Sequence, residues 1–159
     1  MKHVNVALFV PHAGCPHQCS FCNQKTISGS IKPLTPEDVT AACDIAKNGG
    51  VTRETSEIAF FGGSFTAVDR DYMVSLLEAA KPYIDGGYFG GIRISTRPDA
   101  IDDERLEILK KYHVTSIELG AQSMDDSVLK INRRGHTAKD VENASHLIKS
   151  YGFSLGLQM

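Results

Sequence analysis

The residues with the clearest capacity for chemistry are three closely spaced cysteines, Cys15, Cys19 and Cys22, in the pattern C-x3-C-x2-C. Three thiolates on a short segment can hold three irons of a cubane iron–sulfur cluster and leave its fourth iron open. A cluster that only carries electrons is usually closed by four cysteines, whereas an open iron can bind a small molecule directly. The spacing therefore predicts a cluster that takes part in chemistry.

A zinc site is the alternative interpretation of the same cysteines. Structural zinc usually takes four Cys or His ligands and commonly joins two C-x2-C halves across a longer loop. The sequence has no second C-x2-C, but His12 or His17 could complete a Cys3His site. A disulfide is less favoured, because the chain shows no signal peptide and four cysteines in 159 residues are few for a secreted scaffold. We expect a reducing, cytoplasmic compartment.

The composition describes an ordinary globular domain. The chain is 42% hydrophobic and 23% charged, with a formal net charge of −2, which suits one hydrophobic core. No apolar run approaches the 18 or so residues of a membrane span, so no membrane partner is expected. The near balance of charge neither indicates RNA binding nor rules it out.

The elements that must position these cysteines alternate between strand-like and helix-like stretches, the pattern of a parallel α/β fold. Five strands are expected near residues 4–10, 57–62, 91–97, 116–122 and 154–159. Helices are expected near residues 35–49, 70–82, 102–112 and 137–150, with a shorter helical piece after Met124. The first helix carries a capping threonine followed by proline at its first position, and Asp69, Asp102 and Thr137 are candidate caps for the later helices.

Alternation within the expected strands predicts a sheet with two unlike faces. In the third strand Ile92 and Ile94 share one face, while Arg93, Ser95 and Arg97 share the other. The fourth and fifth strands repeat this alternation, whereas a sheet covered by helices on both faces would be continuously apolar. We therefore expect a barrel or part of one, with a polar face that binds a ligand near the carboxyl ends of the strands. An antiparallel sheet with one solvent-exposed face is the alternative.

With Phe21 just before the last cysteine, the cysteine pattern resembles that of the radical S-adenosylmethionine (radical SAM) enzymes. The similarity is greatest to the radical SAM domain of the Elongator catalytic subunit and its bacterial relatives. Four further motifs follow in that family's order: FGGSFT at 61–66, STRPD at 95–99, ELGAQS at 118–123 and RGHT at 134–137.

The resemblance implies an α/β fold, a partial (βα) barrel of six units that is similar to part of a TIM barrel. Residues 1–159 would then be a radical SAM core domain that is incomplete at the C-terminus, since the sequence stops within about the fifth strand. A fifth strand without a neighbour exposes a sheet edge and apolar surface. We therefore expect poor solubility of the isolated chain, or cover by another chain.

The resemblance also implies an activity. Cys15, Cys19 and Cys22 would ligate a 4Fe-4S cluster whose open iron binds S-adenosyl-L-methionine; reductive cleavage would give a 5′-deoxyadenosyl radical that abstracts hydrogen from a substrate. An external electron donor is required, and both tRNA and a small molecule are candidate substrates. The alternative is a binding module that holds a cluster or zinc without radical chemistry, and a truncated barrel could be inactive alone.

Cofactor-binding residues follow from the same motifs. The backbone of Gly62 and Gly63 would approach the methionine ammonium, although a tight turn also explains a Gly-Gly pair. Gln122 and Arg134 match positions that contact the ribose and the methionine carboxylate, with Arg133 an alternative to Arg134. Phe21 would lie against adenine through its backbone and ring, with a capping apolar contact as the alternative. Ser64 stands where many relatives carry an acid, which weakens a side-chain role there.

Four further residues are not assigned to catalysis. Arg97 and Glu118 are expected to face the barrel interior, either as a pair or toward the cofactor. Cys43 shares a helical face with core positions such as Val39, so we expect a buried core residue rather than a fourth ligand. His136 is expected to be a turn residue that caps the following helix.

Overall fold

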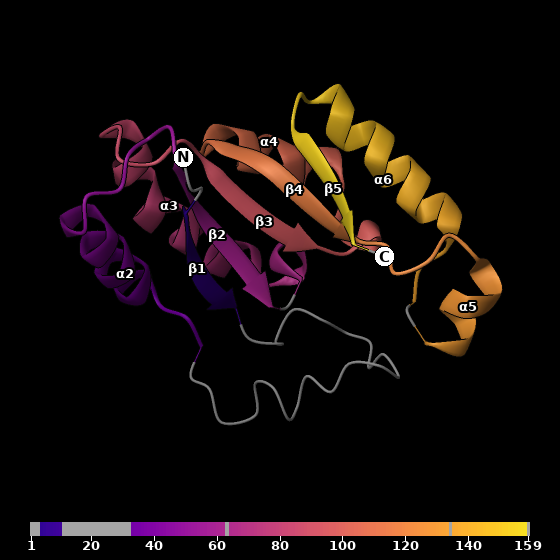
Figure 1. The fold of residues 1–159 in the computed structure, drawn as a ribbon. Helices are drawn as coiled ribbons and strands as arrows, with labels where there is room; N and C mark the ends of the chain where they lie inside the picture. Colours follow the sequence, from indigo (N-terminus) through magenta and orange to yellow (C-terminus); the bar gives the residue numbers. More distant parts are fainter. Residues whose placement is uncertain (1–3, 11–32, 63, 134, 159) are drawn as a thin grey trace.

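The structure, a computed structural model, describes residues 4–10, 33–62, 64–133 and 135–158. Strands and helices alternate along it (Figure 1). The strands are β1 (Val4–Val10), β2 (Ser56–Gly62), β3 (Ile92–Thr96), β4 (Val114–Gly120) and β5 (Ser154–Gln158). The helices are α2 (Pro36–Asn48), α3 (Arg70–Asp85), α4 (Asp103–Lys111), α5 (Asp126–Ile131) and α6 (Ala138–Ser150), with short 3-10 turns at Phe65–Ala67 and Pro98–Ala100.

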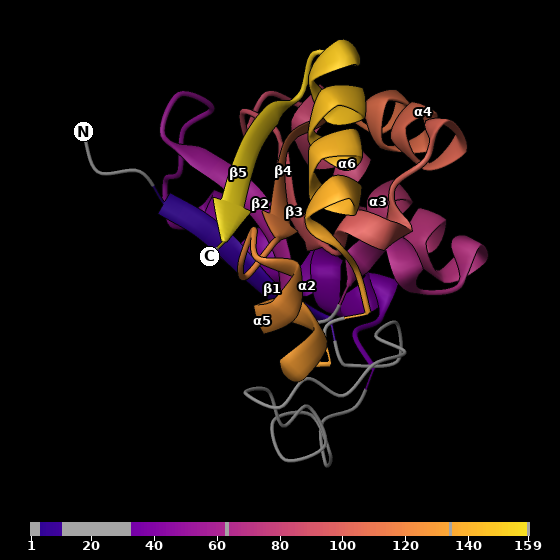
Figure 2. The ribbon, with the colours of Figure 1, turned by 90° about the vertical axis from the view of Figure 1, so that its right-hand side faces the viewer.

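The five strands form one sheet in the order β1-β2-β3-β4-β5, and every neighbouring pair is parallel. This confirms the predicted parallel α/β fold and excludes the antiparallel alternative. The long helices cover one face of the curved sheet, whereas no helix of the described part lies over the opposite face (Figures 1 and 2). The short helix α5 lies instead beyond the carboxyl ends of the strands (Figure 1).

The helix boundaries follow the predicted caps. Thr35 and Thr137 each form a reciprocal capping box at the start of α2 and α6, and Asp69 and Asp102 accept backbone N–H bonds at the starts of α3 and α4. No helix among the described residues is long and apolar enough to cross a membrane.

Helix α3 differs from its prediction, because it continues through Pro82 to Asp85. Proline removes one backbone donor, yet side-chain contacts hold the last turn. Lys81 Nζ lies 2.6 Å from Asp85 Oδ2, and the Tyr83 hydroxyl donates to Asp44 Oδ1 of α2 at 2.6 Å. The helix therefore ends three residues later than proline alone suggested.

The hydrophobic core lies between the sheet and its helices. Ile92 and Ile94 of β3 and Ile117 and Leu119 of β4 are fully buried there, as the alternation predicted. Cys43 on α2 is also fully buried, which confirms its predicted core role, and burial raises the pKa of its thiol to about 12.

Strand β4 begins two residues before the predicted start and ends two residues before the predicted end. The register shifts between Ile92 and Arg93, which pair with Val114 and Ser116, so Thr115 is an extra residue on the β4 side.

The alternation of β5 is weaker than predicted, because Leu157 is 47% exposed. Within the described part of the chain, β5 pairs only with β4.

Candidate functional site

The carboxyl ends of all five strands meet at one edge of the sheet, because every pair is parallel. Val10 ends β1 and pairs with Gly62 at the end of β2. Cys15 follows Val10 by five residues in the sequence. Cys15, Cys19, Phe21 and Cys22 themselves lie outside the described residues.

Gly62 is required by the close packing of β1 and β2 at this edge. Its φ is 107°, a conformation that side-chain-bearing residues rarely adopt. A Cβ at this position would lie 2.7 Å from the Val10 carbonyl oxygen and 2.5 Å from the Phe9 ring. The turn geometry explains this glycine by itself, and it also leaves the backbone uncovered by a side chain. Gly63 lies outside the described residues.

A buried hydroxyl cluster, which the sequence did not predict, joins the ends of β2 and β3. The oxygens of Ser64 and Thr96 lie 2.7 Å apart, and Thr66 Oγ1 also contacts Thr96 Oγ1. Ser64 Oγ further accepts the backbone N–H of Arg97 at 3.1 Å. All three hydroxyl residues are less than 5% exposed. Ser64 therefore has a structural role.

Arg97 directly follows β3, and its backbone is still extended, with φ −91° and ψ 148°. Its side chain is buried, and Nε donates to Asp99 Oδ1 at 2.8 Å while Nη2 donates to Asp99 Oδ2 at 3.2 Å. Glu118 has a different partner, Arg93. The structure thus gives Arg97 an ion pair with Asp99, and Glu118 an ion pair with Arg93.

A row of charged and amide side chains crosses the face without helices. Arg93 of β3 donates to Glu57 of β2 at 3.1 Å and to Glu118 of β4 at 2.9 Å, and Gln158 of β5 donates to Glu118 at 3.2 Å. Burial acts to lower the pKa of Arg93, but bonds and charge pairing with Glu57 and Glu118 hold it above its ordinary value. The predicted polar face is confirmed at these positions.

Gln122 follows the end of β4 and is half-buried. Its φ is 65°, in the left-handed region, and its backbone N–H donates to the carbonyl of Gln158 at 2.7 Å. This places the residue at the same edge as Gly62. Of the two candidate arginines, Arg134 lies outside the described residues, and Arg133 is exposed with a φ of 55°.

The predicted role of His136 as a helix cap is wrong, because Thr137 caps α6. His136 is instead 5% exposed, and its Nε2 lies 3.1 Å from the carbonyl oxygen of Ala121, next to Gln122. The sequence signal was the RGHT motif, but nothing in it indicated a contact 15 residues away.

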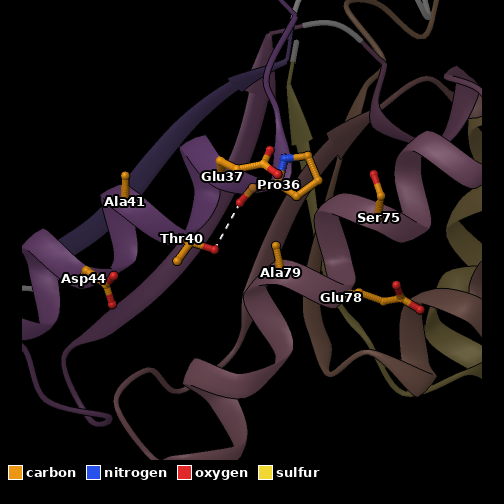
Figure 3. Close-up of a pocket in the computed structure, with 8 residues that line it drawn as sticks. All are labelled: Pro36, Glu37, Thr40, Ala41, Asp44, Ser75, Glu78 and Ala79. Carbon is orange, nitrogen blue, oxygen red and sulfur yellow. Dashed lines mark hydrogen bonds between the residues drawn. The ribbon is translucent and has the colours of Figure 1, made fainter.

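Two observations bear on competing sites. Within residues 4–10, 33–62, 64–133 and 135–158, no group of three or more His, Cys, Asp or Glu side chains could hold a metal ion. A groove of about 620 Å³ between α2 and α3 is bordered by Glu37, Asp44 and Glu78 (Figure 3). This groove lies in the helical layer, away from the polar face, so we do not assign a cofactor to it.

The sequence pattern of the Radical SAM superfamily matches residues 9–158, which include the three cysteines, the edge of the sheet and the polar row. The chain belongs to the radical SAM superfamily. Its five parallel strands and covering helices are those of the radical SAM partial barrel, as solved structures of the fold indicate. The archaeal Methanocaldococcus infernus Elp3 with an N-terminal deletion has a TM-score of 0.69 at 20% identity, covering 99% of this chain and 38% of that one.

A second radical SAM structure, native anSMEcpe with bound AdoMet, has a TM-score of 0.72 at 19% identity and covers 97% of this chain and 43% of that one. Among curated proteins, this chain is similar to a tRNA uridine(34) acetyltransferase of Dehalococcoides mccartyi. Identity is 24% over 183 residues, covering 94% of this chain and 39% of the relative. The chain thus spans less than half the length of this relative.

Proposed function

We propose that this chain is the core domain of a radical SAM enzyme. The observation that carries the proposal is the family match over residues 9–158, since it spans C-x3-C-x2-C and the edge of the sheet where Gly62 and Gln122 lie. The donor set fits the group, because three thiolates suit an iron–sulfur cluster with one open iron. When bound, the cluster and S-adenosylmethionine supply reductive cleavage to a 5′-deoxyadenosyl radical and hence hydrogen abstraction.

The chain's own residues would bind and orient these groups. Cys15, Cys19 and Cys22 would hold the cluster. The uncovered backbone at Gly62, with that of Gly63, would accept hydrogen bonds from the methionine ammonium. Gln122 would contact the ribose, and Phe21 the adenine. Arg134 would bind the methionine carboxylate, since a guanidinium can donate two parallel hydrogen bonds.

The substrate would approach the polar face, where Glu57, Arg93 and Glu118 are partly accessible. A similar protein is named for acetylation of tRNA uridine 34, and its match covers 39% of its own length. We therefore propose hydrogen abstraction without assigning the substrate; tRNA and a small molecule remain the two candidates. An external reductant would deliver the electron.

The proposal is tested by anaerobic reconstitution with iron and sulfide, reduction with dithionite, addition of S-adenosylmethionine and mass-spectrometric detection of 5′-deoxyadenosine. The wild type should form the product, and Cys22→Ala should lose it. Cys43→Ala is the matched control: Cys43 is buried in the core, so its loss should leave iron content and product intact.

The metal analysis separates the alternatives. Iron and sulfide in the wild type with no 5′-deoxyadenosine would show that residues 1–159 do not catalyse the cleavage, the outcome expected both of a cluster-holding binding module and of a truncated barrel. Stoichiometric zinc with no iron uptake would contradict the cluster itself. Equal losses in Cys22→Ala and Cys43→Ala would show that thiol loss acts through the fold rather than through ligation.

A further inference from the structure

We propose that His136 is a positioning residue, which holds the carboxyl end of β4 in the conformation that presents Gln122 to the cofactor. The inference rests on the proposed function, because it assigns Gln122 to S-adenosylmethionine. It adds a residue from the loop between α5 and α6 that touches the backbone of β4 rather than the cofactor.

The backbone that follows β4 turns sharply. The N–H of Ala121 donates to the carbonyl of Leu119 at 2.9 Å, and the N–H of Ser123 donates to the carbonyl of Ala121 at 2.7 Å. Between them Gln122 has a φ of 65°. A non-glycine residue in this region is strained by roughly 1–2 kcal/mol, so the surrounding structure must hold it there.

Two contacts from later segments of the chain hold this turn. The N–H of Gln122 donates to the carbonyl of Gln158 at the end of β5, at 2.7 Å. The imidazole of His136 lies against the carbonyl of Ala121, with Nε2 at 3.1 Å. A carbonyl oxygen only accepts, so Nε2 carries the proton in this contact. Because His136 is 5% exposed, water does not readily replace it.

The helix that follows His136 is tied to α5. Gly135 has a φ of 79°, and the N–H of Ala138 donates to Asp126 Oδ1 at 2.7 Å, which ties the start of α6 to α5. The imidazole thus joins the segment just before α6 to the strained turn. Without its donor, the turn loses one of the two contacts, and Gln122 can relax toward a commoner φ that moves its side chain.

The test compares His136→Gln with His136→Asn, two variants whose side-chain amides differ in length. In His136→Gln the amide nitrogen can occupy the place of Nε2, whereas in His136→Asn it falls nearer the place of Nδ1. Binding of S-adenosylmethionine to the cluster-loaded protein is measured by equilibrium dialysis. We expect His136→Asn and His136→Leu to bind roughly tenfold more weakly than wild type, and His136→Gln to stay within about threefold. The exposed His146 provides the control His146→Leu, which should bind as wild type.

A double-mutant cycle separates positioning from general damage. If His136 acts through Gln122, then Gln122→Ala should bind weakly, and adding His136→Asn should weaken binding by less than about twofold more. A readout that needs no cofactor is hydrogen exchange at the amides of Gln122 and Ser123. Exchange should be faster in His136→Asn than in His136→Gln.

Four results would overturn the inference. Equal binding and equal exchange in His136→Gln and His136→Asn would exclude the Nε2 contact as the cause. Losses that multiply in the double variant would show that His136 acts independently of Gln122. Absence of S-adenosylmethionine binding by cluster-loaded wild type would remove the proposed function and this inference with it, whereas binding by wild type with no change in His136→Asn would remove this inference alone.

Discussion

Gly62 and Ser64 stand two residues apart at the end of β2, and the structure gives each a physical reason. Gly62 has a φ of 107° and lies against the backbone of Val10, so a side chain has no room. Ser64 is 3% exposed and bonds to Thr96, so its hydroxyl holds β3 rather than facing the ligand edge. The FGGSFT motif thus combines a steric requirement for glycine at position 62 with a buried hydrogen bond of Ser64.

The steric requirement predicts that Gly62→Ala destabilises the protein by about 3 kcal/mol, because strain at positive φ adds to a collision with the Val10 carbonyl. Gly50→Ala is the control: Gly50 has a φ of 83°, but a Cβ there meets nothing within 4 Å. It should cost only about 1 kcal/mol. Urea unfolding of both variants measures the difference, and equal losses would contradict the packing argument.

At the scale of the elements, the row across the sheet links four strands through side chains as well as through backbone bonds. Arg93 stands between Glu57 and Glu118, at 15% and 28% side-chain exposure, and Gln158 extends the row to β5. Partly buried carboxylates without a cation repel each other across a low dielectric. The single arginine therefore stabilises the polar face that the proposed substrate would meet.

We predict that a variant without the Arg93 cation has a stability that depends on pH. Arg93→Met should lose about 1–2 kcal/mol at pH 7.5, because Glu57 and Glu118 on either side of β3 lose the cation between them. The folded variant then binds protons more readily than its unfolded chain, so its stability should rise as pH falls from 7.5 toward 5 and the difference from wild type should shrink.

The control for this change is Arg70→Met, which removes a contact with Glu104 at 65% and 63% side-chain exposure. An exposed pair should contribute less than about 0.5 kcal/mol and should not alter the pH profile. Thermal unfolding at pH 5, 6 and 7.5 measures both variants. A constant deficit for Arg93→Met across this range would contradict the charge argument.

For the whole molecule, the sheet has helices on one face and strand β5 at its edge. Leu157 is 47% exposed on that strand, and β5 pairs with β4 alone among the described strands. An edge strand with exposed apolar surface favours association with another chain. The predicted poor solubility follows from this surface and stays a prediction.

The edge predicts concentration-dependent self-association that Leu157→Thr reduces. Ile45→Thr is the control, because Ile45 is 75% exposed on α2, which packs at the opposite end of the sheet near β1, and its loss should leave association through β5 unchanged. Sedimentation velocity over a range of protein concentrations measures both variants. A monomeric wild type at all concentrations, or an equal effect of the two substitutions, would show that the edge does not drive association.

Local patterns in the sequence were sufficient for the main elements. Thr35 and Thr137 cap the helices that they predicted, and the alternation at Ile92 and Ile94 identified the apolar face of β3. These features depend on residues within one turn or one strand, where spacing alone determines which atoms meet. The cysteine spacing is also a local pattern. It indicated the superfamily that the match over residues 9–158 establishes.

Only the tertiary structure decided which polar groups meet at the carboxyl ends of the strands and on the polar face. A register shift at Arg93 places this arginine between Glu57 and Glu118, and no local pattern contains that shift. The contact of His136 with Ala121 likewise joins segments 15 residues apart. Such contacts depend on register and loop geometry set by the packing of the whole domain, because each partner lies on a different element.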